Sequence, residues 1–187
     1  MLLAGDVGAT KTALALFDER KPDAAPVRGA ILPSRAHAGL EEAVRAFLAG
    51  GPPEPITAAC FGVPGPIVDG RAEPVNLPWR VEAAGLAAEL GVPRVEVMND
   101  FVAAAYGVEA LGPSKQTILQ PGIAAPHGAK VVLGAGTGLG VAALVWTGEG
   151  YQAVASEAGH MDFAPLGPRQ AGLAEALASR FGRVSYE

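Results

Sequence analysis

Apolar and polar positions in the first hundred residues follow two periods, and each period predicts a different kind of element. Short runs rich in β-formers predict strands, whereas apolar residues at helical spacing predict helices. The strand candidates are 2–7, 12–19, 27–34, 56–63 and 94–99. The helix candidates are 40–50, 81–91 and 100–111. The first two strands flank the short turn Gly8-Ala9-Thr10, so they predict an opening hairpin.

The segment 63–79, rich in proline and glycine, separates the fourth strand from the second helix. Its composition predicts a long loop or a short hairpin. Loops of this length in compact domains are often functional.

Beyond residue 110 the pattern changes to strands joined by turns. The segment 111–130 is rich in Gly, Pro and Gln, so we place a domain boundary near residue 110. Strands are predicted at 130–136, 140–146 and 151–159, with turns at Gly138 and 148–150, and a closing helix at 168–182. Strands and helices alternate along the chain, which indicates an α/β or α+β fold.

Composition narrows the class of protein. The 187 residues are 50% hydrophobic and carry a formal charge of −5, which suits a folded core and argues against binding nucleic acid or a membrane surface. The single cysteine, Cys60, excludes an intramolecular disulfide and a cysteine zinc cluster, and its apolar neighbours predict a buried thiol. The uncharged stretch 131–148 is long enough to cross a membrane, but its glycines favour two strands around a turn. The first residues lack a signal-peptide pattern, so we expect a cytoplasmic protein.

The first candidate site is the turn Asp6-Val7-Gly8-Ala9-Thr10-Lys11-Thr12. Gly8 lets the backbone approach a ligand closely, adjacent N–H groups can form an anion-binding nest, and Thr10 adds a hydroxyl. Asp6, at a strand end, suits a magnesium ion held through water, since magnesium keeps much of its hydration. An ordinary tight hairpin with turn-forming Asp and Gly explains the same residues, so both interpretations stay open.

A second glycine-rich turn is Gly134-Ala135-Gly136-Thr137-Gly138-Leu139-Gly140. Its glycines recur at every second position and a β-rich run follows, whereas the dinucleotide-binding fingerprint needs G-x-G-x-x-G and a helix. A Walker A motif is excluded because no Gly-Lys-Ser/Thr is present. A glycine hairpin that cradles phosphate and a β-turn in a core sheet both remain. The strand–glycine turn–strand pattern of residues 2–17 is weakly repeated here at 131–146.

The segment Ser156-Glu157-Ala158-Gly159-His160-Met161-Asp162 has a glutamate and a histidine three residues apart. This spacing suits a turn that presents two polar side chains to one small ligand. A metal site is a rival interpretation, but the other histidines, His37 and His127, fall in predicted loops, which disfavours zinc. A hydrogen-bonded, partly buried histidine also explains His160.

Asn99-Asp100 stands where a short apolar strand runs into a helix. Asn and Asp are both good helix N-caps, and we expect Asp100 to cap a helix that starts at Phe101. Ligands of open α/β sheets bind outside the carboxyl ends of the strands. The carboxylate of Asp100 is therefore also a candidate base aimed at a substrate.

Four motifs together carry a family resemblance, which covers almost the whole chain: LLAGDVGATKTALALF, VMNDFVAAAYGV, VVLGAGTGLGVAALV and SEAGHMDFAP. In this order and spacing they resemble the bacterial ATP-dependent glucokinase family, of the hexokinase–actin–Hsp70 superfamily. ACFGVPGPIVDGRAEPVNLPW resembles that family's sugar-side loop, and FGRVSYE resembles a segment whose glutamate contacts glucose.

The resemblance implies a fold and a domain organisation. The fold is α/β, the two-domain sugar-kinase fold of the actin-like ATPase and ribonuclease H-like group. Residues 1–110 would form the small N-terminal α/β domain and 111–187 part of the large domain. Because the family continues well past residue 187, we expect a truncated chain with the C-terminal large domain incomplete.

The resemblance also implies an activity, the transfer of a phosphoryl group from ATP to the 6-hydroxyl of glucose, the first step of glycolysis. Asp100 would be the catalytic base that accepts the hydroxyl proton. The implied sugar-binding residues are Asn76, Asn99, Asp100, Glu157, His160 and Glu187. The implied nucleotide-binding residues are Asp6, Gly8, Ala9, Thr10, Lys11, Gly136, Thr137 and Gly138, with Asp6 also serving Mg²⁺ through water.

The expected cofactors and partners are ATP, Mg²⁺ and glucose. Neither nucleic acid nor a membrane is expected as a partner. A homodimer is possible. Two rival functions stay open. One is a conformational ATPase of the actin or Hsp70 kind, which would share only the phosphate hairpins. The other is a non-catalytic sugar-binding fragment. Within the kinase class, another hexose such as mannose or fructose is a milder alternative.

Overall fold

The computed structural model of the chain describes residues 1–21, 24–51, 55–74, 76–136 and 138–187. The chain divides into two compact units, unit 1 (Met1–Ala104) and unit 2 (Ala105–Glu187). Each unit contains a sheet of its own. Among the described residues, no helix combines the length and the apolar character that are needed to cross a bilayer.

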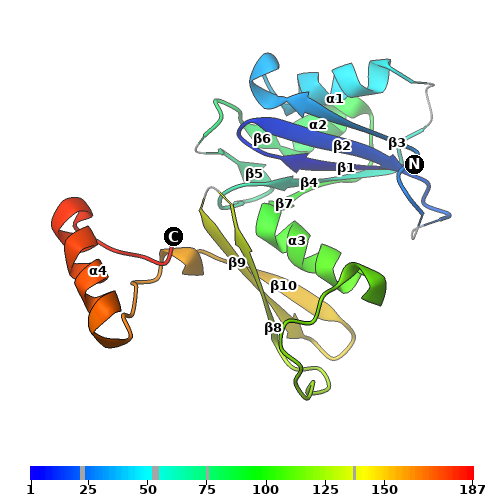
Figure 1. Ribbon diagram of the computed structural model, residues 1–187. Helices are drawn as coiled ribbons and strands as arrows, with labels where there is room; N and C mark the ends of the chain where they lie inside the picture. Colours follow the sequence, from blue (N-terminus) through cyan, green and yellow to red (C-terminus); the bar gives the residue numbers. More distant parts are fainter. Residues whose placement is uncertain (22–23, 52–54, 75, 137) are drawn as a thin grey trace. The chain divides into compact units, whose positions relative to one another are not determined.

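The main sheet of unit 1 has five strands in the order β3-β2-β1-β4-β7 (Figure 1). Their bounds are β1 Leu2–Val7, β2 Lys11–Phe17, β3 Arg28–Pro33, β4 Ala58–Val63 and β7 Val95–Asn99. β1, β2 and β3 pair antiparallel, which confirms the predicted opening hairpin and third strand. β1, β4 and β7 pair parallel, so their carboxyl ends meet at one edge of the sheet.

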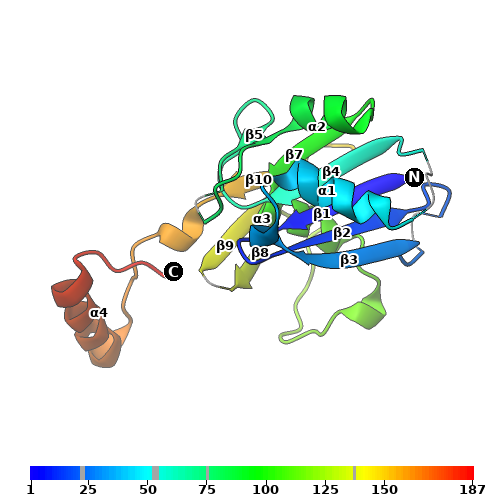
Figure 2. The ribbon, with the colours of Figure 1, turned by 90° about the horizontal axis from the view of Figure 1, so that it is seen from above.

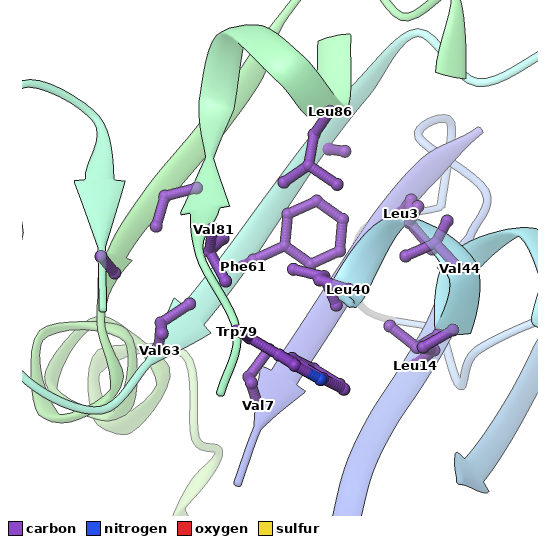
Figure 3. Close-up of a cluster of buried hydrophobic side chains, with 14 of the residues drawn as sticks. Leu3, Val7, Leu14, Leu40, Val44, Phe61, Val63, Trp79, Val81 and Leu86 are labelled. Carbon is purple, nitrogen blue, oxygen red and sulfur yellow. The ribbon is translucent and has the colours of Figure 1, made fainter. Parts of the chain in front are cut away.

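Helices α1 (Leu40–Ala49) and α2 (Ala83–Leu90) cover one face of this sheet (Figures 1 and 2). Alternate strand residues point to that face, because side chains alternate across a strand. Leu3 and Phe61 are almost fully buried there, together with Val44 of α1 (Figure 3). This core holds the strand ends of unit 1 in place.

The described residues of the segment 63–79 are mostly loop, with one short pairing. β5 (Arg71–Ala72) pairs antiparallel with β6 (Val81–Glu82). α2 therefore begins two residues later than predicted, because the first two residues of the expected helix are extended and paired. Trp79 is buried and donates its Nε1–H to the carbonyl oxygen of His37 at 3.1 Å. This bond ties the loop to the core of unit 1.

Unit 2 contains an antiparallel meander in the order β10-β9-β8. The strands are β8 Lys130–Ala135, β9 Leu139–Trp146 and β10 Tyr151–Ser156, as the sequence pattern predicts. Residues 131–135 and 139–146 of the uncharged stretch thus lie in two paired strands. The remaining elements are α3 Asp100–Glu109, α4 Gly167–Phe181 and the short 3₁₀ turns η1 Ser34–Ala36, η2 Pro113–Lys115 and η3 Ala158–His160.

Cys60 of β4 is only partly buried, so the prediction of a buried thiol is wrong. Its neighbours Ala59 and Phe61 face the core, and the alternation of side chains turns Cys60 to the opposite face of the sheet. Burial still raises the pKa of the Cys60 thiol, and the negative charge of Glu96 adds to the effect. A raised pKa leaves little reactive thiolate at neutral pH.

Candidate functional site

The turn between β1 and β2 lies at the edge of the sheet where the parallel strands of unit 1 end. The Gly8 N–H donates to the carbonyl oxygen of Lys11 at 2.9 Å. A Cβ on Gly8 would lie 2.9 Å from that same oxygen, so the close approach requires glycine. Asp6 and Thr10 are both exposed here. The five predicted nucleotide-binding residues of unit 1 therefore share one turn with a carboxylate and a hydroxyl at its surface.

Two buried hydroxyls, of Thr12 and Ser34, lie behind this turn, and Ser34 belongs to none of the predicted motifs. Ser34 Oγ is 2.6 Å from the carbonyl oxygen of Gly8 and 2.9 Å from Thr12 Oγ1. The Ser34 N–H also donates to the carbonyl oxygen of Thr10 at 3.0 Å. Ser34 belongs to η1, far along the chain from the turn, so no local pattern connects the two. The one available signal was a polar Thr12 among the apolar alternate positions of β2.

Asn99 caps α3, and the prediction that Asp100 is the cap is wrong. Asn99 Oδ1 accepts hydrogen bonds from the N–H groups of Phe101 at 3.0 Å and Val102 at 3.2 Å. Those are the second and third residues of the helix, which are the usual donors to an N-cap. The Asn99 amide also donates to the carbonyl oxygen of Gly65 at 3.0 Å, which binds the 63–79 loop to the strand end.

Asp100 is the first residue of α3, one position later than the cap. Its Oδ1 accepts from the N–H of Phe101 at 2.9 Å. The carboxyl group is half-buried, and the N-terminal end of a helix favours a negative charge at this position. Asn99 therefore makes the capping bonds of α3, and the Asp100 carboxyl group lies at the carboxyl end of β7.

Asp100 and the Gly8 turn lie at the same edge of the unit 1 sheet, with β4 between β1 and β7. Neighbouring strands are about 4.8 Å apart, so two strand spacings amount to about 10 Å. A Cβ on Gly62 of β4 would lie 3.5 Å from the Cα of Asp100 and 3.2 Å from the Cβ of Ala103. Glycine at this position lets α3 start close against the sheet, and Gly62 is not among the predicted site residues.

In unit 2, Glu157, His160 and Glu187 form one cluster. His160 Nδ1 is 3.0 Å from Glu187 Oε2, and His160 Nε2 is 3.9 Å from Glu157 Oε2. The chain returns after α4, where the Glu187 N–H donates to the carbonyl oxygen of Gly159 at 3.0 Å. His160 is 59% exposed, so it is not the partly buried histidine of the alternative interpretation.

The cluster places an imidazole between two carboxylates at the surface of unit 2. Carboxylates accept hydrogen bonds, and an imidazole donates or accepts according to its tautomer. A ligand with several hydroxyl groups, each able to donate and accept, matches this arrangement. Charge-assisted hydrogen bonds of this kind are the stronger ones.

Two glycines allow the cluster to form. A Cβ on Gly159 would overlap the carbonyl oxygen of Leu139, so η3 packs directly on the start of β9. A Cβ on Gly138 would overlap the carboxylate of Glu187. The predicted sugar-binding Glu187 therefore lies against the backbone of the hairpin whose glycines are predicted to bind phosphate.

For the predicted residues Gly136, Thr137 and Asn76 the structure describes fewer contacts. Gly136 is exposed and donates its N–H to the carbonyl oxygen of Gly138 at 2.9 Å, within the hairpin between β8 and β9. Strand β9 follows, which confirms that the segment is not a dinucleotide-binding turn. Thr137 lies outside the described residues. Asn76 is exposed on the loop whose Gly65 carbonyl binds Asn99.

No group of three or more His, Cys, Asp or Glu side chains able to hold a metal ion occurs in the described part of the chain. Magnesium does not need such a group, because it is usually bound by one or two carboxylates together with waters and substrate phosphates. Asp6, exposed at the end of β1, supplies one carboxylate beside the Gly8 turn. The residues present therefore fit a magnesium ion that arrives with a nucleotide.

Comparison with known proteins connects these features to one family. The sequence model of the glucokinase family matches residues 3–187. A glucokinase from Synechocystis sp. is 38% identical over 199 residues, which cover 99% of this chain and 56% of the relative. The chain spans about half the length of the curated relatives it matches.

Solved structures agree with this assignment. The crystal structure of a glucokinase from an Antarctic psychrotroph is 30% identical, with a TM-score of 0.85, and covers 100% of this chain and 59% of that one. A glucokinase from Balamuthia mandrillaris in complex with glucose is 22% identical, with a TM-score of 0.70 over 100% of this chain and 58% of that one, and shows likeness of fold alone. The predicted α/β sugar-kinase fold and the predicted resemblance are both confirmed. Because the family's sequence model matches nearly every residue, and relatives and fold agree with it, the chain belongs to the glucokinase family.

Proposed function

We propose that the protein carrying this chain is an ATP-dependent glucokinase, which transfers the γ-phosphoryl group of ATP to the 6-hydroxyl of glucose. The products are glucose 6-phosphate and ADP. The observation that carries the proposal is the Glu157–His160–Glu187 cluster in a chain of the glucokinase family. It is a recognition surface for hydroxyl groups and has no evident use in an enzyme that only hydrolyses ATP.

Sugar recognition falls to the polar side chains. Glu157, His160 and Glu187 form hydrogen bonds with sugar hydroxyls, with Asn76 and Asn99 as further ligands. A site built to pair with hydroxyl groups rejects analogues that lack one, because its own polar groups are then left without partners. The proposed selectivity for glucose over its epimers rests on this pairing rather than on apolar packing.

Asp100 is the proposed general base. It accepts the proton of the 6-hydroxyl as the oxygen attacks the γ-phosphorus of ATP, and the bond from that phosphorus to the ADP oxygen breaks. Two observations support this role. Asp100 follows directly on the carboxyl end of β7, and it lies at the same sheet edge as the Gly8 turn.

The phosphates of ATP are proposed to lie on the two glycine turns. Backbone N–H groups and the Thr10 hydroxyl in one turn, and Gly136, Thr137 and Gly138 in the other, position the phosphate oxygens. Positioning and charge stabilisation supply most of the catalysis in phosphoryl transfer. Asp6 would hold the Mg²⁺ through water, and the bound ion neutralises charge on the phosphates.

The reaction places the protein at the entry of glucose into glycolysis, in the cytoplasm where ATP is abundant. Residues 1–110 and 111–187 are proposed as the small domain and part of the large domain. The proposal admits a homodimer, and analytical ultracentrifugation decides between monomer and dimer.

The experiment is a calorimetric titration of the folded chain with glucose and, separately, with galactose. The proposal predicts saturable binding of glucose that galactose does not reproduce. Glu187→Gln should weaken that binding, because the amide presents only one acceptor oxygen to the sugar. Glu175→Gln is the matched control, since Glu175 is exposed on α4 away from the cluster.

A coupled assay for glucose 6-phosphate, run with an active form that contains residues 1–187, tests turnover. Formation of glucose 6-phosphate from ATP and glucose supports the kinase. ATP hydrolysis that does not depend on glucose would favour a conformational ATPase. Glucose binding without turnover in every form tested would favour a non-catalytic sugar-binding protein. Faster turnover of mannose or fructose would change the substrate and keep the reaction class.

A further inference from the structure

Two polar side chains are completely buried beside the turn of unit 1. Thr12 and Ser34 each have 0% of their surface exposed, and they are the buried polar side chains of the described residues. Buried hydroxyls are retained where they satisfy a hydrogen bond that the fold needs. For Ser34, in η1, the hydrogen bonds lead to the turn between β1 and β2.

The direction of each hydrogen bond follows from the number of protons. A serine hydroxyl has one proton, and a carbonyl oxygen can only accept. The Ser34 proton therefore goes to the carbonyl oxygen of Gly8, 2.6 Å away. Thr12 Oγ1 must then donate to Ser34 Oγ across 2.9 Å. Thr12 thus holds Ser34 in the orientation in which Ser34 binds the turn.

Ser34 binds the turn at two points. Besides the hydroxyl bond to Gly8, its backbone N–H donates to the carbonyl oxygen of Thr10 at 3.0 Å. A trans peptide unit is planar, with its C=O and N–H pointing in opposite directions. Fixing the carbonyl of Gly8 therefore fixes the N–H of Ala9, and fixing the carbonyl of Thr10 fixes the N–H of Lys11. Both N–H groups are turned away from Ser34.

These directions are what an anion-binding turn requires. Backbone N–H groups attract phosphate oxygens, whereas carbonyl oxygens repel them. Ser34 retains the carbonyl oxygens of Gly8 and Thr10 on its own side of the turn, so the N–H groups of the same two peptide planes point to the other side, away from Ser34. Preorganised donors stabilise a charged ligand without a reorganisation cost.

We propose that Ser34, held by Thr12, is a positioning residue for the phosphates of ATP, acting through the carbonyl oxygens of Gly8 and Thr10. It does not touch the nucleotide. The inference rests on the proposed function in that it takes the Gly8 turn as the phosphate site of a glucokinase.

The test compares the Michaelis constants for ATP and glucose in an active form that contains residues 1–187. Ser34→Ala should raise the KM for ATP about tenfold, since it removes a bond to a buried carbonyl group. The KM for glucose should change less than about twofold, because no sugar ligand depends on Ser34. Thr12→Val keeps the shape of the side chain and should give a smaller rise for ATP, which Thr12→Ser should largely reverse by restoring the hydroxyl.

A purely structural role is excluded by a stability-matched control. Val44→Ala leaves a cavity in the unit 1 core and lowers the melting temperature without touching the turn. It should leave both KM values unchanged. If Ser34→Ala behaves like Val44→Ala, or raises both KM values equally, the inference is overturned. If Ser34→Ala does not fold, Thr12→Val and Thr12→Ser replace it. A rise in the KM for ATP alone in Thr12→Val, reversed in Thr12→Ser, supports the inference, and equal rises in both KM values overturn it.

A binding measurement separates this inference from the proposed function. Mg²⁺–ATP is titrated into ¹⁵N-labelled protein while the amide signals of Ala9 and Lys11 are followed. Shifts that saturate in the wild type and need about tenfold more ATP in Ser34→Ala support the inference, even if glucose is not phosphorylated. Phosphorylation of glucose with equal ATP affinity in both proteins sinks the inference and keeps the kinase. A wild type that neither binds ATP at these amides nor phosphorylates glucose overturns both.

Discussion

The two glycine turns have similar sequences, but they are supported in different ways. The Gly8 turn is held from behind by the buried hydroxyls of Thr12 and Ser34, in the unit that contains the main apolar core. The β8–β9 hairpin packs instead against the carboxylate of Glu187, and the cluster around it is largely exposed. A strand–glycine turn–strand pattern therefore specifies a shape, while its neighbours decide how firmly the shape is held and which chemistry lies beside it.

The difference extends to the units themselves. The main cluster of buried apolar side chains lies in unit 1. In unit 2, large apolar side chains such as Leu133 and Phe181 are 65% and 64% exposed. Unit 1 therefore places its turn on a larger apolar core, whereas the cluster of unit 2 is held by its own ion pairs and by backbone hydrogen bonds.

Asp100→Ala should have the largest effect on turnover. Loss of a general base costs about 10²–10⁴-fold in kcat. Stability should fall by only about 1 kcal/mol, because Asn99 keeps its capping bonds while the favourable charge at the start of α3 is lost. Steady-state kinetics and thermal melting of the active form measure both quantities. Turnover close to that of the wild type would refute the assigned role.

Phe61→Ala should have the largest effect on stability. Phe61 is fully buried at the centre of the unit 1 core (Figure 3), and such truncations cost about 3–5 kcal/mol. Leu133→Ala in unit 2 is the comparison, and should cost far less because Leu133 is mostly exposed. Chemical denaturation measures both. Equal losses would contradict the stated difference between the units.

Gly159→Ala should disrupt the unit 2 cluster. The new Cβ would overlap the carbonyl oxygen of Leu139, and overpacking of this kind costs about 1–3 kcal/mol. Because His160 adjoins Gly159, affinity for glucose should fall with stability. Calorimetry with glucose measures the loss.

Gly172→Ala is the matched control for Gly159→Ala. Gly172 lies within α4 and a Cβ there would meet no atom within 4 Å. Alanine is the better helix former, so this variant should be slightly more stable and bind glucose unchanged. Unchanged glucose affinity in Gly159→Ala would show that the packing of η3 on β9 does not position the cluster.

The smallest effect on stability is expected at Asp18, which follows β2 at the end of the strand opposite the Gly8 turn. There the hydrogen bonds from the side chain and backbone of Arg20 lower the pKa of Asp18 to about 2. A pKa below the unfolded value adds stability above about pH 4, and this stability is lost as the pH falls toward 2. Melting of Asp18→Asn should therefore differ from the wild type at pH 5 and converge with it near pH 2. The difference should be small because Arg20 is mostly exposed. A gap that widens toward pH 2 would contradict this sign.

Much of the fold was predictable because it follows from local patterns. The β1–β2 hairpin, the third strand, the β8–β10 meander and the long helices all lie where periodicity indicated. The errors occurred where a neighbour in space decided the outcome. Val81 and Glu82 pair with β5 instead of joining α2, and Cys60 faces away from the core.

The candidate site was predictable in its residue types and less so in its organisation. Motif resemblance indicated Asp100, Glu157, His160 and Glu187, and their roles stay predictions. Ser34 and Gly62 carry no local signal, because their importance comes from what lies beside them. The choice of Asn99 over Asp100 as the cap depended on the position at which β7 ends and α3 starts.

The sequence by itself determined the order of strands and helices, the two glycine turns and the family, because period, turn chemistry and motif spacing are properties of the chain. Tertiary structure alone decided that Ser34 binds the Gly8 turn and that Glu187 meets His160. It also decided that Gly62 lies close against α3 and that glycine is required where Gly159 meets β9. These contacts join residues distant in sequence, and whether two such residues meet depends on how the elements pack against one another.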